Sequence, residues 1–387
     1  MVTYPKDWKE VLIGDIYQIK RGQVLATSKI SPIKNATNKY PVYSSQTLNN
    51  GLLGYFNQYL FSDGITWTTD GANAGTTKYR EGKFYCTNVC GVLSSQVGYA
   101  NICMAEIINI ETPKYVSYVG NPKLMSNVVS KISIILPPLP EQQAIASVLS
   151  DFDEHIGNLS GLIEKKKAIR DGALEDLVSG RTRLDGFSGE WIESTIEDST
   201  KEIITGGTPS TTVDKYWGGS IPWLASTEIH QKIITRATKN ITKIGLNNSS
   251  AKMAPKDSVL IALAGQGKTR GTAAFLAYPM ALNQSLAALV AADETDSKFL
   301  YYLIENMYLE LRELSSGDGG RGGLNKTLIK NINIRLPREI KEQHAIAEVL
   351  TAMDEEIESL KIEKEKMIQI KEGAMDDLLT GRVRLKV

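Results

Sequence analysis

Two long stretches of the chain carry apolar residues at spacings of mostly three and four, and this pattern predicts two long amphipathic helices. The stretches are residues 141–184 and 342–385, and Gly180 and Gly381 follow the last apolar residue of each, as glycines that end helices do. Neither apolar stripe is stable facing water, so we expect the helices to pack together. The interface residues that we predict are Ile145, Leu149, Phe152, Ile156, Leu159, Ile346, Leu350, Met353, Ile357 and Leu360.

The two stretches are copies of one sequence, offset by 201 residues without a gap, and 22 of their 44 aligned positions are identical. Residues 132–137 resemble residues 332–337 just before each copy, and Trp8 and Trp191 open the two halves. A repeat of this size predicts two equivalent halves. A pseudo-two-fold axis between them would pair the helices as an antiparallel coiled coil. Two unrelated helical hairpins are the alternative.

The segments around the helices differ from them in composition. Residues 1–140 (the first block) and 185–341 (the second block) hold all 16 tyrosines and all five tryptophans. Short β-branched runs broken by Gly, Asn, Ser and Pro predict strands at residues 40–43, 64–69, 258–263 and 271–276. Helices are expected at residues 298–314 and around 115–119. We therefore predict an α+β protein of four segments: block 1–140, helix 141–184, block 185–341 and helix 342–387.

Charge is unevenly spread along a chain whose net charge is zero. Residues 1–140 hold 13 basic and 8 acidic residues, and residues 201–280 hold 10 basic and 4 acidic, whereas both helices are net acidic. Two local cationic surfaces on a neutral chain are compatible with phosphate binding. Ordinary charge variation is the alternative.

A search for catalytic chemistry finds little. The cysteines Cys86, Cys90 and Cys103 lack zinc-site spacing and are too few for a disulfide framework, which favours a reducing cytoplasm. The run ending in Lys268-Thr269 resembles a phosphate-binding loop, but Ala262 stands at its first glycine. We expect no catalytic residue, cofactor or metal site on this chain, and no membrane segment, because no run approaches ~18 apolar residues.

Polar, glycine-rich loops are the candidate binding elements. Residues 70–80 and 265–271 lie at corresponding places in the two blocks, and glycines allow a backbone to approach phosphate closely. Asn, Gln, Lys and Arg side chains match the hydrogen-bonding edges of adenine and guanine. Each loop alone could equally be a solvated turn. The predicted DNA-binding residues are Lys20, Arg21, Gln23, Asn73, Thr77, Lys78, Arg80, Thr208, Ser210, Gln266, Lys268, Thr269 and Arg270.

The layout resembles that of the specificity (S) subunits of type I restriction-modification systems. Their helices follow a proline-rich strand exit and Glu-Gln, which here is Leu136-Pro-Pro-Leu-Pro-Glu-Gln142, with Asp153 in the helix. The second copy, at residues 336–343, has one residue inserted and lacks the second proline. Residues 206–209 and 221–224 also look like segments of the family's second recognition domain.

The resemblance implies a protein that reads DNA and has no activity of its own. Each block would be a target-recognition domain for one half of a split, asymmetric site in double-stranded DNA, and the helices would set the spacer between the halves. Two methyltransferase subunits would dock on the chain and hold S-adenosylmethionine. Restriction subunits, using ATP and Mg, would join if the system cuts DNA.

Two other classes compete with this hypothesis. One is a coiled-coil dimeriser with two carbohydrate- or peptide-binding modules, which the absence of a secretion signal disfavours. The other is a self-contained methyltransferase or nuclease, which would need motifs that the chain lacks. The one Pro-Pro pair, at Pro137, has neither the Asn or Asp nor the aromatic neighbour of adenine methyltransferases.

Overall fold

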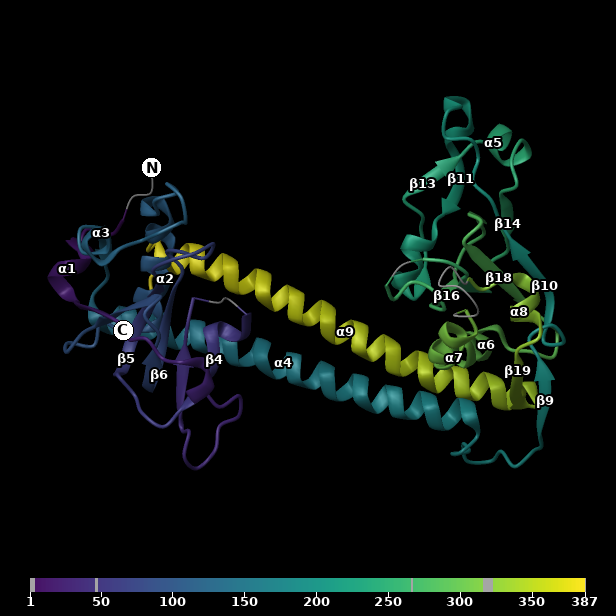
Figure 1. The fold of residues 1–387 in the computed structure, drawn as a ribbon, viewed down its shortest axis with the longest axis horizontal. Coiled ribbons are helices and arrows are strands. Elements are labelled where there is room, and N and C mark those ends of the chain that lie inside the picture. Colours follow the sequence, from purple (N-terminus) through teal and green to yellow (C-terminus); the bar gives the residue numbers. More distant parts are fainter. Residues whose placement is uncertain (1–3, 46–47, 266, 316–322, 387) are drawn as a thin grey trace. The chain divides into compact units, whose positions relative to one another are not determined.

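The computed structural model describes residues 4–45, 48–265, 267–315 and 323–386 (Figure 1). The chain forms two compact units. Unit 1 comprises Met1–Gly161 with Lys361–Val387, and unit 2 comprises Leu162–Leu360. This division differs from four consecutive segments, because each long helix contributes one part to unit 1 and the other part to unit 2.

Unit 1 contains the first block, whose centre is one six-stranded sheet of order β2-β7-β5-β6-β3-β4. A helix, α2, covers β6 and is capped by Asn101, whose side chain accepts a hydrogen bond from the Met104 amide. The elements of the block are β1 (Lys9–Leu12), α1 (Ile13–Ile16), β2 (Gln18–Arg21), β3 (Tyr40–Tyr43), β4 (Leu52–Phe56), β5 (Phe61–Thr68), β6 (Thr77–Cys86), β7 (Cys90–Ser94), α2 (Ile102–Glu111), α3 (Ser126–Val129) and β8 (Ser133–Leu136).

Unit 2 contains the second block, which has two sheets: a five-stranded one of order β10-β18-β15-β16-β12 and a four-stranded one of order β13-β11-β17-β14. Its elements are β9 (Trp191–Thr195), β10 (Thr200–Thr205), β11 (Trp217–Leu224), β12 (Ile233–Ile234), β13 (Lys239–Ile241), α5 (Lys243–Asn247), β14 (Lys252–Ala254), β15 (Ser258–Ala262), β16 (Ala273–Leu276), β17 (Met280–Leu282), β18 (Leu286–Ala291), α6 (Ser297–Asn306), α7 (Tyr308–Leu314), α8 (Lys326–Lys330) and β19 (Asn333–Pro337).

The main sheets of the two blocks share one topology. In unit 1 the pairs β2–β7, β7–β5 and β5–β6 are antiparallel and β6–β3 is parallel. In unit 2 the pairs β10–β18, β18–β15 and β15–β16 are antiparallel and β16–β12 is parallel. The sequences of the blocks show only weak similarity, so the likeness of the sheets is a structural finding. The four-stranded sheet of unit 2 lies outside this shared arrangement.

The long helices are α4 (Leu139–Ser179) and α9 (Ile340–Leu379), of 41 and 40 residues. Within each unit the two helices run antiparallel. In unit 1, Asp153 pairs with Lys371 and His155 lies 3.8 Å from Glu363. In unit 2, Lys166 pairs with Glu356 at 2.6 Å. The terminal glycines Gly180 and Gly381 have φ of 73° and 70°, which is the left-handed conformation predicted for them.

The first turn of each long helix is fixed by the same set of hydrogen bonds to a buried glutamate, and we call this set the seal. In unit 1 the Glu141 carboxylate, 2% exposed, accepts hydrogen bonds from Trp8 Nε1 at 2.9 Å and from Arg384 Nε at 2.5 Å. In unit 2 Glu342, 1% exposed, accepts from Trp191 Nε1 at 3.3 Å and from Arg183 Nε at 2.6 Å. In both units the partner arginine comes from just beyond the end of the other long helix.

Two further features repeat beside each seal. The glutamine that follows the glutamate, Gln142 or Gln343, donates from Nε2 to the carbonyl of Pro137 or Pro337 at 2.8 Å. The preceding strand pairs with the strand that opens the block, β8 with β1 and β19 with β9. The residue inserted in the second copy therefore leaves this glutamine contact intact.

The apolar stripes of the helices pack against each other near the seals and also against the blocks. In unit 1 Ile145 and Leu149 are buried in one cluster with Leu378 and residues of α2. In unit 2 Ile346 and Leu350 lie in one cluster with the C-terminal part of α4 and residues of α6. Of the other predicted interface residues, Leu159 and Ile357 are buried, and Phe152, Ile156, Met353 and Leu360 are half-buried.

Two local expectations were wrong. The helix expected around residues 115–119 does not form at residues 116–119. The 3-10 turn Thr112–Tyr115 directly follows α2, and the backbone at Val116 is extended. Residues 70–80 do not form one loop, since β6 begins at Thr77 and continues the sheet. The predicted helix at 298–314 is confirmed as α6 and α7, which are separate helices that meet at Met307.

Candidate nucleic-acid interface

In unit 1 three turns meet at one edge of the main sheet, and we call residues 21–23, 69–76 and 87–89 the first loop edge. Arg21, at the end of β2, joins them. Its Nη2 donates to Asp70 Oδ2 at 2.9 Å and to Thr69 Oγ1 at 3.2 Å, and its Nε donates to the Asn88 carbonyl at 2.9 Å. The Arg21 side chain remains 41% exposed, so its guanidinium is presented at the surface in a fixed orientation.

Glycine is required where β2 runs into this edge. The Gly22 amide donates to the Cys90 carbonyl at 2.9 Å, and a Cβ on Gly22 would lie 2.2 Å from the Thr87 carbonyl oxygen. Unit 2 has the same arrangement after β10. The Gly207 amide donates to the Leu282 carbonyl at 2.9 Å, and a Cβ on Gly206 would lie 1.8 Å from that oxygen.

In unit 2 the corresponding surface is the second loop edge, residues 206–210, 264–265, 267–272 and 283–285. The Thr208 hydroxyl donates to Gln284 Oε1 at 2.6 Å, and both residues are exposed. Thr269 Oγ1 lies 3.1 Å from His230 Nε2. The edge therefore presents hydroxyl and amide groups, with the His230 imidazole beside it, and such groups can hydrogen-bond base edges or phosphates.

The loop at residues 267–272 is held by the helix α7. The Tyr308 hydroxyl donates to the Lys268 carbonyl at 3.1 Å, and Arg312 Nη1 donates to the Gly267 carbonyl at 2.6 Å. Arg270 is turned back, with its Nη1 donating to the Ser315 carbonyl at 3.3 Å, whereas Lys268 is exposed. Of the predicted loop residues that the structure describes, Lys268 is thus exposed, whereas Thr269 and Arg270 are half-buried and hydrogen-bonded.

Some predicted DNA-binding residues lie inside unit 1. Thr77 is 2% exposed and donates to the Ala105 carbonyl. Arg80 is 6% exposed, lies over the Tyr43 ring and donates to Thr66 Oγ1 and to the Asn50 carbonyl. The two side chains point to opposite faces of β6, Thr77 toward α2 and Arg80 toward Tyr43 and Asn50. Both are buried by what packs on their face, and this burial counts against direct contact with DNA.

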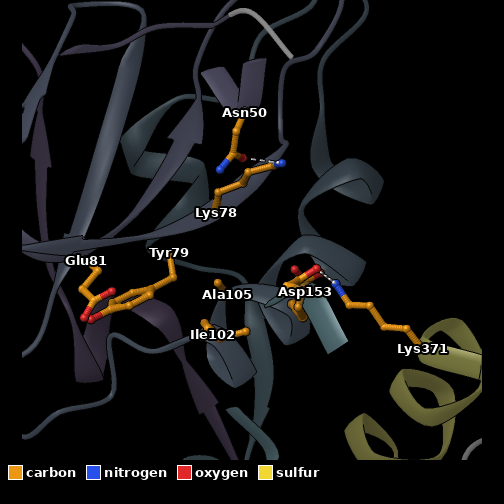
Figure 2. Close-up of a pocket in the computed structure, with 9 residues that line it drawn as sticks. Asn50, Lys78, Tyr79, Glu81, Ile102, Ala105, Asp153 and Lys371 are labelled. Atoms are coloured by element: carbon orange, nitrogen blue, oxygen red, sulfur yellow. Dashed lines mark hydrogen bonds and ion pairs between the residues drawn. The ribbon is translucent and has the colours of Figure 1, made fainter. Parts of the chain in front are cut away.

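Lys78 lies in a pocket of about 500 Å³ between β6, α2 and the long helices of unit 1 (Figure 2). Its Nζ donates to Asn50 Oδ1 at 2.6 Å, and burial, then the nearby Arg80 guanidinium, lowers its pKa. Burial raises the pKa of Glu106 in the same pocket. Lys78 is nevertheless exposed, and its ammonium group points to Asn50, so its role at DNA stays a prediction.

The other predicted residues are placed as follows. Lys20 and Gln23 are exposed beside Arg21, and Ser210 is exposed near Thr208. Asn73 is half-buried, and its Nδ2 donates to the Ser45 carbonyl at 3.4 Å. Gln266 lies outside the described residues.

Sequence reasoning missed three polar residues at the loop edges. Asn88 and Gln284 lie in turns before β7 and β18, and His230 lies beside Thr269. A signal for Gln284 existed, since residues 283–285 are a polar interruption of the apolar run from Met280 to Val290. His230 had none, because it is 39 residues from its partner in the chain.

Comparison with known proteins identifies the family. The family model of the type I restriction modification DNA specificity domain matches residues 5–166 and 189–371. Each matched segment covers most of one block and most of the helix that follows it. The chain therefore belongs to this family.

Individual relatives of the chain support the same family assignment. The specificity subunit of the type I restriction enzyme MjaVIII from Methanocaldococcus jannaschii is 26% identical over 429 aligned positions, covering 99% of this chain and 94% of that protein. The specificity subunit of the type I restriction enzyme MpnII from Mycoplasma pneumoniae is 38% identical over 153 residues, or 38% of this chain. That match spans 44% of the MpnII subunit, so the chain matches less than half of that relative's length.

A solved structure has the same fold. The crystal structure of the type I restriction-modification S subunit from M. genitalium superposes with a TM-score of 0.67 at 17% identity, covering 98% of this chain and 97% of that one. The α+β fold class is thereby confirmed. Across the part of the chain that the structure describes, no helix combines the length and apolar character needed to cross a bilayer.

Proposed function

We propose that this chain is the DNA sequence-specificity subunit of a type I restriction-modification complex, and that each block reads one half of a bipartite, asymmetric site. The observation that supports it most directly is the pair of loop edges. They occupy the same place on two sheets of equal topology, yet carry different polar side chains. Two sheets of the same topology that carry different surface residues are suited to bind two different DNA sequences.

We further propose that the long helices form a coiled coil that sets the number of unread base pairs between the half-sites. At the usual rise per residue, helices of 41 and 40 residues are about 60 Å long. The repeated seals at Glu141 and Glu342 support a pseudo-two-fold relation between the halves. Seals of this kind would attach each block to both helices.

The chain itself is proposed to be non-catalytic. Methylation of adenine would be carried out by two methyltransferase subunits that bind S-adenosylmethionine, and cleavage by restriction subunits that use ATP and Mg. Within the described ranges, no group of three His, Cys, Asp or Glu side chains is arranged to hold a metal ion. Equilibrium dialysis of the purified chain against S-adenosylmethionine tests this assignment, and stoichiometric binding would contradict it.

Long-read methylation sequencing of the host, with and without the gene, tests the function. We expect one bipartite motif with methylated adenines to vanish on deletion and to return with a plasmid copy. A methylome that is unchanged although the protein is absent would refute the proposal.

Inserting one helical turn at corresponding points of both long helices tests the coiled-coil spacer. The expected result is a motif with the same two halves and a longer spacer. An unchanged spacer in an assembled, active complex would discard the spacer role while leaving the specificity function in place.

A further inference from the structure

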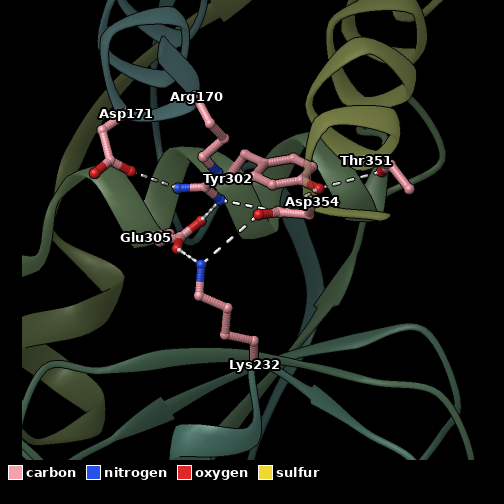
Figure 3. A network of polar contacts seen from close by, with 7 residues as sticks. All are labelled: Arg170, Asp171, Lys232, Tyr302, Glu305, Thr351 and Asp354. Carbon is pink, nitrogen blue, oxygen red and sulfur yellow. Dashed lines mark hydrogen bonds and ion pairs between the residues drawn. The ribbon is translucent and has the colours of Figure 1, made fainter. Parts of the chain in front are cut away.

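The second block contacts the long helices of unit 2 through a cluster of four charged side chains (Figure 3). Arg170 of α4 donates from Nη2 to Asp354 of α9 at 3.0 Å and also to Glu305 of α6. Lys232 comes from the segment before β12, and its Nζ lies 3.1 Å from Glu305 Oε1 and 3.8 Å from Asp354 Oδ1. Two cations and two carboxylates thus alternate around one point.

The interior of this cluster is well protected from water. The Arg170 side chain is 4% exposed, and those of Glu305 and Asp354 are 20% and 22% exposed. The Tyr302 hydroxyl also donates to Asp354 Oδ2 at 3.1 Å. Charges that are shielded from water in this way interact more strongly than surface pairs do, so Arg170, Glu305 and Asp354 are held in a fixed orientation. The Lys232 side chain is 55% exposed and reaches the two carboxylates from the surface.

Lys232 is unusual because its backbone is in a conformation that side-chain-bearing residues rarely adopt. Its φ is +60° and its ψ is −65°. Its carbonyl accepts a hydrogen bond from the Phe275 amide of β16 at 2.7 Å, and its ammonium group is held by the two carboxylates. Lys232 is thus held in a strained backbone conformation with both its carbonyl and its ammonium group bonded. Strain of this kind points to a role in connecting the parts that the residue contacts.

Lys232 connects the second loop edge to the helices. It directly follows the 3-10 helix Ser226–Gln231, in which His230 contacts Thr269 of the edge. Phe275, bonded to the Lys232 carbonyl, lies in the strand into which the 267–272 loop runs. One residue therefore touches both the support of the loop and the carboxylates on α6 and α9, which in turn bind Arg170 of α4.

We propose that Lys232 is a positioning residue that holds the 267–272 loop, and with it the second loop edge, in a fixed orientation on the helices of unit 2. Lys232 acts through His230 and β16 and need not touch DNA. This inference rests on the proposed function, since the orientation matters only if the edge reads DNA.

Unit 1 provides an internal contrast. The repeat places Asp153 and Lys371 at the positions of Asp354 and Arg170, and these two residues pair at 2.6 Å beside the pocket of Figure 2. The block's lysine there, Lys78, donates to Asn50 rather than to a carboxylate. Among the described residues of the first block, no lysine is seen to make the bridge that Lys232 makes, so loss of Lys232 is expected to affect only the half-site read by unit 2.

The test uses the chain assembled with its methyltransferase subunits and compares Lys232→Met, Lys232→Gly and Lys232→Arg by methylation sequencing. Glycine relieves the backbone strain but removes the ammonium group, and arginine keeps the charge. Lys201→Met is the matched control, because Lys201 pairs with Asp293 at the exposed surface of the same unit. The variants' thermal unfolding is measured alongside.

We expect the Met and Gly variants to lose discrimination against single mismatches by about tenfold in one half of the motif only. The Arg variant and the Lys201→Met control are expected to keep wild-type discrimination. Full discrimination in the Met and Gly variants, or equal relaxation in both halves, would overturn the positioning role. By contrast, a wild-type complex without any bipartite motif would refute the proposed function itself.

Discussion

Replacing Arg170 by methionine should destabilise unit 2 much more than the same change at Lys371 destabilises unit 1. The two residues occupy equivalent positions of the repeat, 201 residues apart. Arg170 is buried between Glu305 and Asp354, whereas the carboxylate that pairs with Lys371, on Asp153, is 58% exposed. The pair of substitutions therefore tests how burial changes the value of one ion pair.

The magnitude follows from what each substitution leaves behind. Removing one partner of a buried ion pair typically costs 3–5 kcal/mol, because the other charge stays buried without compensation. Glu305 and Asp354 keep about one fifth of their exposure and Lys232 remains beside them, so we expect the lower end, about 3 kcal/mol. For Lys371→Met we expect less than about 1 kcal/mol, the value of a surface pair.

Thermal unfolding and hydrogen exchange measure the difference. For a unit of this size, 3 kcal/mol corresponds to a fall in Tm of about 6–12 °C. Amide exchange assigns the loss to a unit, since α6 should lose protection in Arg170→Met while α2 should not. If both variants lose equal stability, or if Arg170→Met loses under about 1 kcal/mol, then burial of the cluster contributes little and the reasoning is refuted.

Three further predictions concern unit 1. Burial holds the pKa of Glu106 above its usual range, so ionisation of this carboxyl destabilises the folded state as pH rises through the ordinary carboxyl range. Glu106→Gln should therefore raise Tm at pH 7 and leave it unchanged near pH 4. A Tm difference that does not depend on pH would contradict this. Gly91→Ala would put a Cβ 2.0 Å from the Trp67 ring and should cost about 1–3 kcal/mol in denaturant unfolding; an unchanged midpoint would contradict the packing. Lys20→Ala should lower the slope of log affinity against log salt by about one without changing sequence preference, as for a phosphate contact; an unchanged slope would place Lys20 outside the interface.

Local periodicity in the sequence was enough to predict the parts of the fold that depend on neighbouring residues. The three-and-four spacing gave both long helices to within a few residues, and the left-handed glycines at their ends followed from position alone. A helix at Ile102–Glu111 was overlooked in a continuous apolar run, although Asn101 was available as an N-terminal cap. Apolar runs carry little periodicity, which is why this helix was missed.

Tertiary structure alone decided which surface residues are available and how the blocks are attached. Thr77 and Arg80 are buried on opposite faces of β6, which depends on what packs against each face. The shared sheet topology of the two blocks depends on backbone pairing between distant strands. The seal between Glu141 and Arg384 joins residues 243 positions apart. Such hydrogen bonds and ion pairs join residues that become neighbours only when the chain folds. A pattern of residues that are close in the sequence therefore cannot predict them.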